Sequence, residues 1–75
     1  MYHLIEFAAD FMVDLETSPR NWLEQMLVQR GTRVQAQLRP YVVETREGPV
    51  EVADLYFEDG AVTRGIPFAF FSFVE

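Results

Sequence analysis

Seventy-five residues suffice for one domain, which buries only about 60% of the surface that its unfolded chain exposes. The six basic residues are all arginine and face twelve acidic residues, and the resulting net charge of −6 argues against direct binding of nucleic acid, because that affinity comes from basic side chains that neutralise phosphates. The absence of cysteine and the single histidine exclude disulfides, thiolate metal sites and the usual zinc frameworks.

The first segment, residues 2–16, fits two kinds of secondary structure. A helix places seven apolar side chains on one broad face: Leu4, Ile5, Phe7, Ala8, Phe11, Met12 and Leu15. It also stacks three carboxylates on the opposite face, those of Glu6, Asp10 and Asp14. A strand instead places six apolar side chains on one side: Ile5, Phe7, Ala9, Phe11, Val13 and Leu15. We expect the helix, because fifteen residues is near the ordinary helix length and well above the mean strand.

The next segment predicts a helix over residues 19–30. Ser18 is a suitable N-cap, Pro19 suits the first helical position, and Gly31 follows the end. Four apolar residues recur at helical spacing, namely Trp22, Leu23, Met26 and Leu27. They are expected to form one apolar stripe.

From residue 33 onward the pattern changes to that of strands. Val34, Ala36 and Leu38 alternate with polar residues, which is typical of a half-buried strand, and Pro40 indicates an edge or a bend. Residues 41–44 continue this strand, and a turn at 46–49 leads into another at 50–58.

Two local irregularities are expected in the second half of this sheet. The apolar phase of the strand at 50–58 switches midway, which predicts a bulge near Ala53 or Asp54. Asp59-Gly60 is a hairpin signal that joins this strand to one at 61–64. The second half is therefore expected to be an antiparallel meander.

The tail bears a resemblance to a known fold. The run Arg64-Gly65-Ile66-Pro67, followed by Phe73-Val74-Glu75, is similar to the closing strand of SH3-like barrels, in which such a run precedes a short turn and a last strand. A helix followed by the strand at 34–38 resembles the Sm-like layout. The expected class is α+β: one or two N-terminal helices followed by a four-stranded antiparallel sheet, curled into a small SH3-like or Sm-like partial barrel. All 75 residues are expected to form one domain.

The residues that could support catalysis or a cofactor are few. A Ser–His–Asp arrangement would need His3 with Ser18 or Ser72, which are better explained as a helix cap and a strand residue. The four glycines all fall at turns or caps, so no phosphate-binding loop is expected. We expect no enzymatic activity, no cofactor and no small-molecule substrate.

The carboxylates of Glu6, Asp10 and Asp14 allow three interpretations. They could form a solvated helix face, a docking stripe for a basic partner, or, with His3 one turn away, a metal site. We expect no metal, and retain these three residues as candidates for partner binding.

The C-terminal run is the most informative segment. Four phenylalanines lie within six residues: Phe68, Phe70, Phe71 and Phe73. In a strand the first two would face opposite to the last two unless a bulge intervenes, so both faces would be apolar. One aromatic pair would then need cover from a helix, a second subunit or a protein partner.

The expected function is a small non-enzymatic protein-binding module or regulatory subunit. It would dock on a protein partner, or on copies of itself, through the four phenylalanines and the three carboxylates. The alternative is an acidic charge-mimic inhibitor that blocks a nucleic-acid-binding protein, as some phage anti-defence proteins do. No apolar stretch is long enough to span a membrane and no signal peptide is evident, so a cytoplasmic location is expected.

Overall fold

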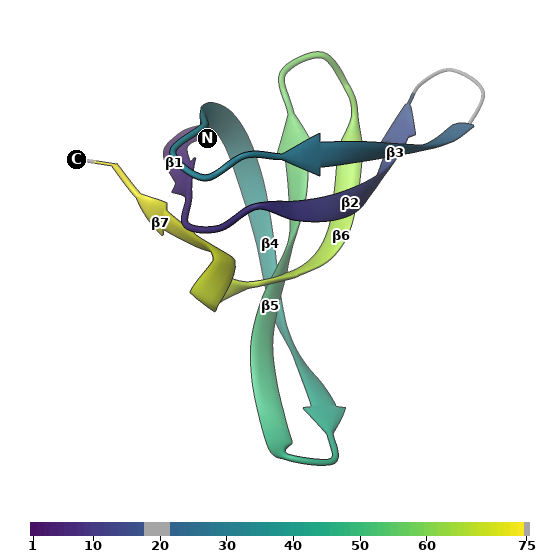
Figure 1. Ribbon diagram of the computed structural model, residues 1–75, viewed down its shortest axis with the longest axis vertical. Coiled ribbons are helices and arrows are strands. Elements are labelled where there is room, and N and C mark those ends of the chain that lie inside the picture. Colours follow the sequence, from purple (N-terminus) through teal and green to yellow (C-terminus); the bar gives the residue numbers. More distant parts are fainter. Residues whose placement is uncertain (18–21, 75) are drawn as a thin grey trace.

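The computed structural model describes residues 1–17 and 22–74, and these form strands and one turn of 3₁₀ helix. The elements are β1 (His3–Phe7), β2 (Phe11–Thr17), β3 (Trp22–Val28), β4 (Arg33–Thr45), β5 (Gly48–Phe57), β6 (Val62–Pro67), η1 (Phe68–Phe70) and β7 (Phe71–Phe73). The strands form one antiparallel sheet in the order β3-β2-β6-β5-β4-β1-β7, which curls into a half-barrel (Figure 1). Within the described residues, no helix has the length and apolar character needed to cross a membrane.

The helix expected over residues 2–16 is wrong. This segment forms β1 and β2, which pair with different parts of the sheet: β1 with β4 and β7, and β2 with β3 and β6. The alternation itself was informative, since Ile5, Phe7 and Val13 are buried on the inner face. The strand interpretation lacked only the turn at residues 8–10, which divides one run of alternation into two strands.

The helix expected over residues 19–30 is also wrong. Residues 22–28 form β3, which pairs antiparallel with all of β2. Ser18 and Pro19, the expected helix start, lie outside the described residues. Met26 and Leu27 of the expected stripe remain 42% and 55% exposed, so this half of the stripe is not buried. Pairing with β2 decides the conformation, because tertiary partners override local propensity.

The expected four-stranded sheet is therefore wrong: the sheet has seven strands, and the described residues that precede it in the prediction are strands rather than helices. The strands predicted from residue 33 onward correspond to β4, β5, β6 and β7, and three further strands occupy the place of the helices. The α+β class, with an SH3-like or Sm-like partial barrel behind N-terminal helices, is replaced by a half-barrel built almost wholly of strands.

The core lies on the concave inner face of this sheet. It consists of Ile5, Phe7, Val13, Val28, Ala36, Ala53, Leu55, Ile66 and Phe71. Val34 and Leu38 of β4 pack against it on either side of Ala36, as the period-two pattern predicts.

The predicted hairpin at Asp59-Gly60 is confirmed, and it joins β5 to β6. Its loop is longer than two residues: the Phe57 amide donates to the Ala61 carbonyl at 2.9 Å, and the Asp59 carboxylate accepts from the Ala61 amide at 3.0 Å. Gly60 adopts a φ of 88°, a left-handed conformation that suits glycine.

The register shifts where a bulge was predicted, between Ala53 and Leu55, but the extra residue lies on β6 and not on the strand at 50–58, so the assignment of the bulge to that strand is wrong. Between the pairs Ala53–Ile66 and Leu55–Thr63, β6 carries one residue more than β5. Arg64 and Gly65 of β6 thus face the single residue Asp54 of β5, and Gly65 has a φ of 70°.

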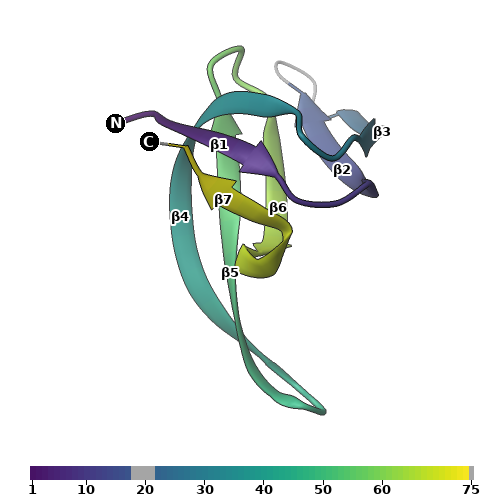
Figure 2. The same cartoon turned by 60° about the vertical axis from the view of Figure 1, so that its left-hand side comes forward.

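The strands β4 and β5 are longer than their neighbours can cover. On the outer edges of this pair, β1 pairs with β4 only as far as Ala36, and β6 pairs with β5 only from Val52. Residues 41–51 therefore form a two-stranded arm that projects from the body (Figures 1 and 2). The radius of gyration is 12.3 Å, against about 11 Å for a compact domain of this length.

Candidate functional site

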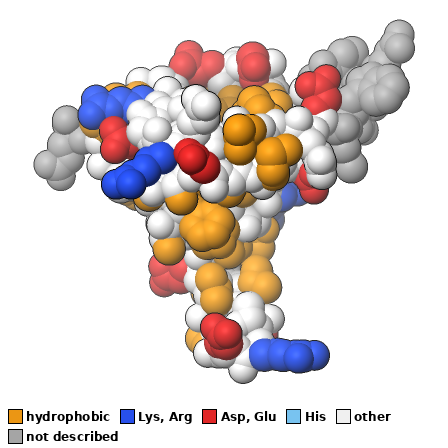
Figure 3. All heavy atoms as spheres, in the orientation of Figure 1, with side chains coloured by type: hydrophobic (Ala, Val, Ile, Leu, Met, Phe, Trp, Pro, Cys, Tyr) orange, Lys and Arg blue, Asp and Glu red, His pale blue; other side chains and the backbone are white. Residues whose placement is uncertain are grey.

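The arm exposes apolar side chains on both of its faces. Val42, on the inner face, is 56% exposed, while Tyr41 and Val43, on the outer face, are each 40% exposed. Val50 of β5 lies directly opposite Val43. Figure 3 shows hydrophobic side chains continuing from the body along the arm, with charged side chains at its tip.

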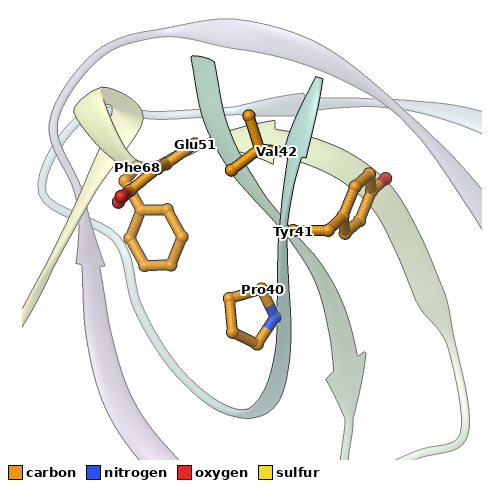
Figure 4. A pocket seen from close by; sticks show the side chains of 5 residues that line it. All are labelled: Pro40, Tyr41, Val42, Glu51 and Phe68. Atoms are coloured by element: carbon orange, nitrogen blue, oxygen red, sulfur yellow. The ribbon is translucent and has the colours of Figure 1, made fainter. Parts of the chain in front are cut away.

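A hollow of about 270 Å³, the arm hollow, lies on the inner side of the arm. Its lining residues are Pro40, Tyr41, Val42, Glu51 and Phe68. In Figure 4 the rings of Phe68 and Pro40 lie on two sides of the opening, and the Glu51 side chain runs beside Phe68. The Tyr41 ring points to the other side of β4. The hollow is therefore an apolar recess with one carboxylate at its rim.

The root of the arm is fixed by Asp54, which is only 5% exposed. Its Oδ1 accepts hydrogen bonds from the Tyr41 hydroxyl at 2.8 Å and from the Gly65 amide at 2.9 Å, and its Oδ2 accepts from Arg64 Nη1 at 3.2 Å. These contacts tie β4 and the β6 bulge to the middle of β5. We call this group the Asp54 clamp.

The clamp extends to β2 through Arg64, whose Nε lies 2.6 Å from Glu16 Oε2. The hydrogen bond to Glu16, reinforced by its charge, raises the pKa of Arg64 above its ordinary value. The hydrogen bond to Asp54, with desolvation and the Asp54 charge, raises the pKa of Tyr41. The clamp thus favours the protonated form of Tyr41.

The four predicted phenylalanines are not two pairs on opposite strand faces. Phe68 and Phe70 lie in η1, which breaks the alternation, and only Phe71 and Phe73 belong to β7. Phe71 is buried in the core and Phe68 packs on it with ring centroids 5.1 Å apart. Phe70 packs against Phe11 with ring centroids 4.8 Å apart and the rings tilted by 59°, yet it remains 36% exposed, and Phe73 is 52% exposed.

The three predicted carboxylates do not form a stripe. Glu6 lies on β1 and pairs with Arg33 at 2.9 Å. Asp10 lies in the β1–β2 turn, where its Oδ1 accepts from the Arg30 amide at 2.6 Å, and Asp14 lies exposed on β2. In the described part of the chain, no three His, Asp or Glu side chains gather closely enough to hold a metal ion.

The structure brings together three residues that were not predicted to belong to a site: Pro40, Val42 and Glu51. Of the predicted residues, only Phe68 lines the arm hollow. Strand length was the available signal, since a strand over residues 33–44 followed by another over 50–58 exceeds the mean of five to six residues and cannot be covered along its whole length.

A second hollow, of about 390 Å³, lies beside the β5–β6 turn, at the opposite end of β5 from the arm. It is lined by Leu15, Met26, Val34, Gln35, Phe57, Glu58, Asp59 and Ala61. None of the predicted partner-binding residues lines it.

Comparison of the chain with protein-family models, with curated proteins and with solved structures finds no match.

Proposed function

We propose that this chain is a non-enzymatic protein-binding module that docks on a protein partner through its arm and the adjoining Phe68. The observation that carries the proposal is the exposure of Val42 on an arm that no neighbouring strand covers among the described residues. Full burial of a valine is worth about 1.5–3 kcal/mol, so a partner that covers this side chain gains appreciable affinity.

The arm suits docking through side chains rather than through strand addition. Pro40 on β4 and Pro49 on β5 each lack a backbone N–H, so each arm strand misses a donor that an added strand would need. Prolines on exposed strands hinder association between edges. The exposed valines thus remain available to a partner without inviting indiscriminate pairing.

The alternative of a charge-mimic inhibitor has less support. Mimicry of a phosphate backbone needs carboxylates that stand free in a row, whereas Asp54 is enclosed in the clamp and Glu6 is paired with Arg33. Salt separates the two functions: binding by mimicry collapses at moderate ionic strength, whereas apolar docking persists.

The test is affinity capture from the native source, compared between wild type and Val42→Asp, with mass spectrometry of the captured proteins. Gln37→Asp is the matched control, since it places the same charge on an exposed position of the same strand. We expect a specific partner that Val42→Asp loses and Gln37→Asp keeps, with unchanged circular dichroism for both. A partner retained by both variants contradicts docking through the arm.

A further inference from the structure

The arm hollow has the size of an anchor site rather than of a small-molecule site. Its volume of about 270 Å³ lies below the range of roughly 300–1,000 Å³ that is usual for small-molecule pockets. Its walls are apolar, formed by Pro40, Val42 and Phe68. A large apolar side chain of a partner fits inside it, as the buried anchors of protein interfaces fit their pockets.

The charges around the hollow are mainly negative. Glu51 is the charged residue among those that line it, and its side chain runs beside the Phe68 ring (Figure 4). A lysine or arginine placed there would meet both a carboxylate and an aromatic ring. Residues 41–51 carry two more carboxylates, Glu44 and Glu47, against the single guanidinium of Arg46.

The same charges disfavour a second copy of this chain as the occupant. Each copy has a net charge of −6 and an acidic arm, so two arms brought together would place like charges side by side. The complementary partner is basic.

We propose that the arm hollow binds a partner segment in which a large apolar side chain is flanked by lysine or arginine; this inference rests on the proposed function. The apolar side chain enters between Pro40 and Phe68 against Val42. The neighbouring cation pairs with Glu51.

The experiment is an NMR titration of the ¹⁵N-labelled chain with three capped synthetic pentapeptides whose central sequences are Lys-Leu-Lys, Glu-Leu-Glu and Lys-Gly-Lys. We expect the first to shift the amide signals of Val42, Glu51 and Phe68 and to bind roughly tenfold more tightly than the other two. Glu51→Gln should weaken this binding by about two- to fivefold, the value of an exposed ion pair. Glu24→Gln removes an exposed carboxylate from β3, away from the arm, and is the matched control that should leave binding unchanged.

The outcomes separate this inference from the function on which it rests. Equal binding of Glu-Leu-Glu, or no effect of Glu51→Gln, overturns the basic partner while leaving the Val42 capture experiment as an independent test of docking. Equal binding of Lys-Gly-Lys overturns the apolar anchor. Shifts confined to Met26 and Phe57, in the second hollow, overturn the assignment of the site.

Discussion

At the scale of single residues, Asp54 connects three strands of the sheet through its side-chain hydrogen bonds. A buried carboxylate is costly unless hydrogen bonds satisfy it, and Asp54 receives three, from β4 and from both residues of the β6 bulge. Gly65 completes the arrangement, because its positive φ turns its amide toward the carboxylate. The clamp therefore fixes both the bulge and the direction in which the arm leaves the body.

Asp54→Asn should destabilise the chain by about 1–3 kcal/mol, because an amide N–H would face Arg64 in place of an acceptor. The free energy of unfolding in urea measures the effect. Asp14→Asn removes an exposed carboxylate from β2 and serves as control, with an expected change within about 0.5 kcal/mol. Equal stability of the two variants would show that the clamp contributes nothing to the fold.

Tyr41 should give the clamp a dependence on alkaline pH. Its pKa in the folded chain lies above the ordinary value of 10.0, so its contribution to stability is present in full below pH 10 and is lost as the pH rises through the folded pKa. The difference in melting temperature between wild type and Tyr41→Phe should therefore be constant from pH 8 to 9.5 and shrink above pH 10. A difference that stays constant through pH 11 would exclude the link between Asp54 and the Tyr41 hydroxyl.

At the scale of elements, the arm is a hairpin that outgrows its sheet. Isolated two-stranded hairpins are marginally stable in water, so the arm depends on the clamp at its root and on cross-strand pairs such as Val43–Val50. Exposed valines on strands whose outer edges are unpaired would also promote association between chains. The two prolines offset that risk.

Replacing both prolines, in Pro40→Val with Pro49→Val, should restore the missing donors and make the arm associate. We expect light scattering and thioflavin T fluorescence that rise with protein concentration. Adding Val42→Thr to the double variant should reduce both signals, because it removes apolar surface at the same position. A double variant that stays monomeric at high concentration would mean that the prolines do not protect the arm.

The elements also show what the sequence could predict. Alternation identified β4 and β5, turn chemistry located the Asp59-Gly60 hairpin, and the switch in apolar phase located the register shift near Asp54, because these signals are local. The first two strands were missed because their conformation depends on distant partners: β1 pairs with β4 and β7, and β2 pairs with β6. The third, β3, pairs with β2 and was missed because β2 was itself expected to be helical. The spacing of Met26 and Leu27 fits a helix and a strand equally well until those partners are known. Phe68 was the one predicted site residue that reached the arm hollow, since η1 turned Phe70 and Phe71 elsewhere.

At the scale of the whole molecule, the main feature is the arm that projects from the body. The body uses its concave face for the core, and the arm carries exposed apolar side chains away from it (Figures 1 and 3). A net charge of −6 disfavours contact between copies and favours the basic partner proposed above. A small chain has little apolar surface to spare from its core, and the apolar surface on the arm is the one through which we propose that the chain docks.

The most direct test of docking through the arm is site-specific photo-crosslinking in the native source. A benzoylphenylalanine is placed at position 42, on the inner face of the arm, or at position 37, an exposed position on the body portion of the same strand. We expect a discrete crosslinked adduct with another protein from position 42 and none from position 37. Adducts of equal yield from both positions, or none from position 42, would contradict the account.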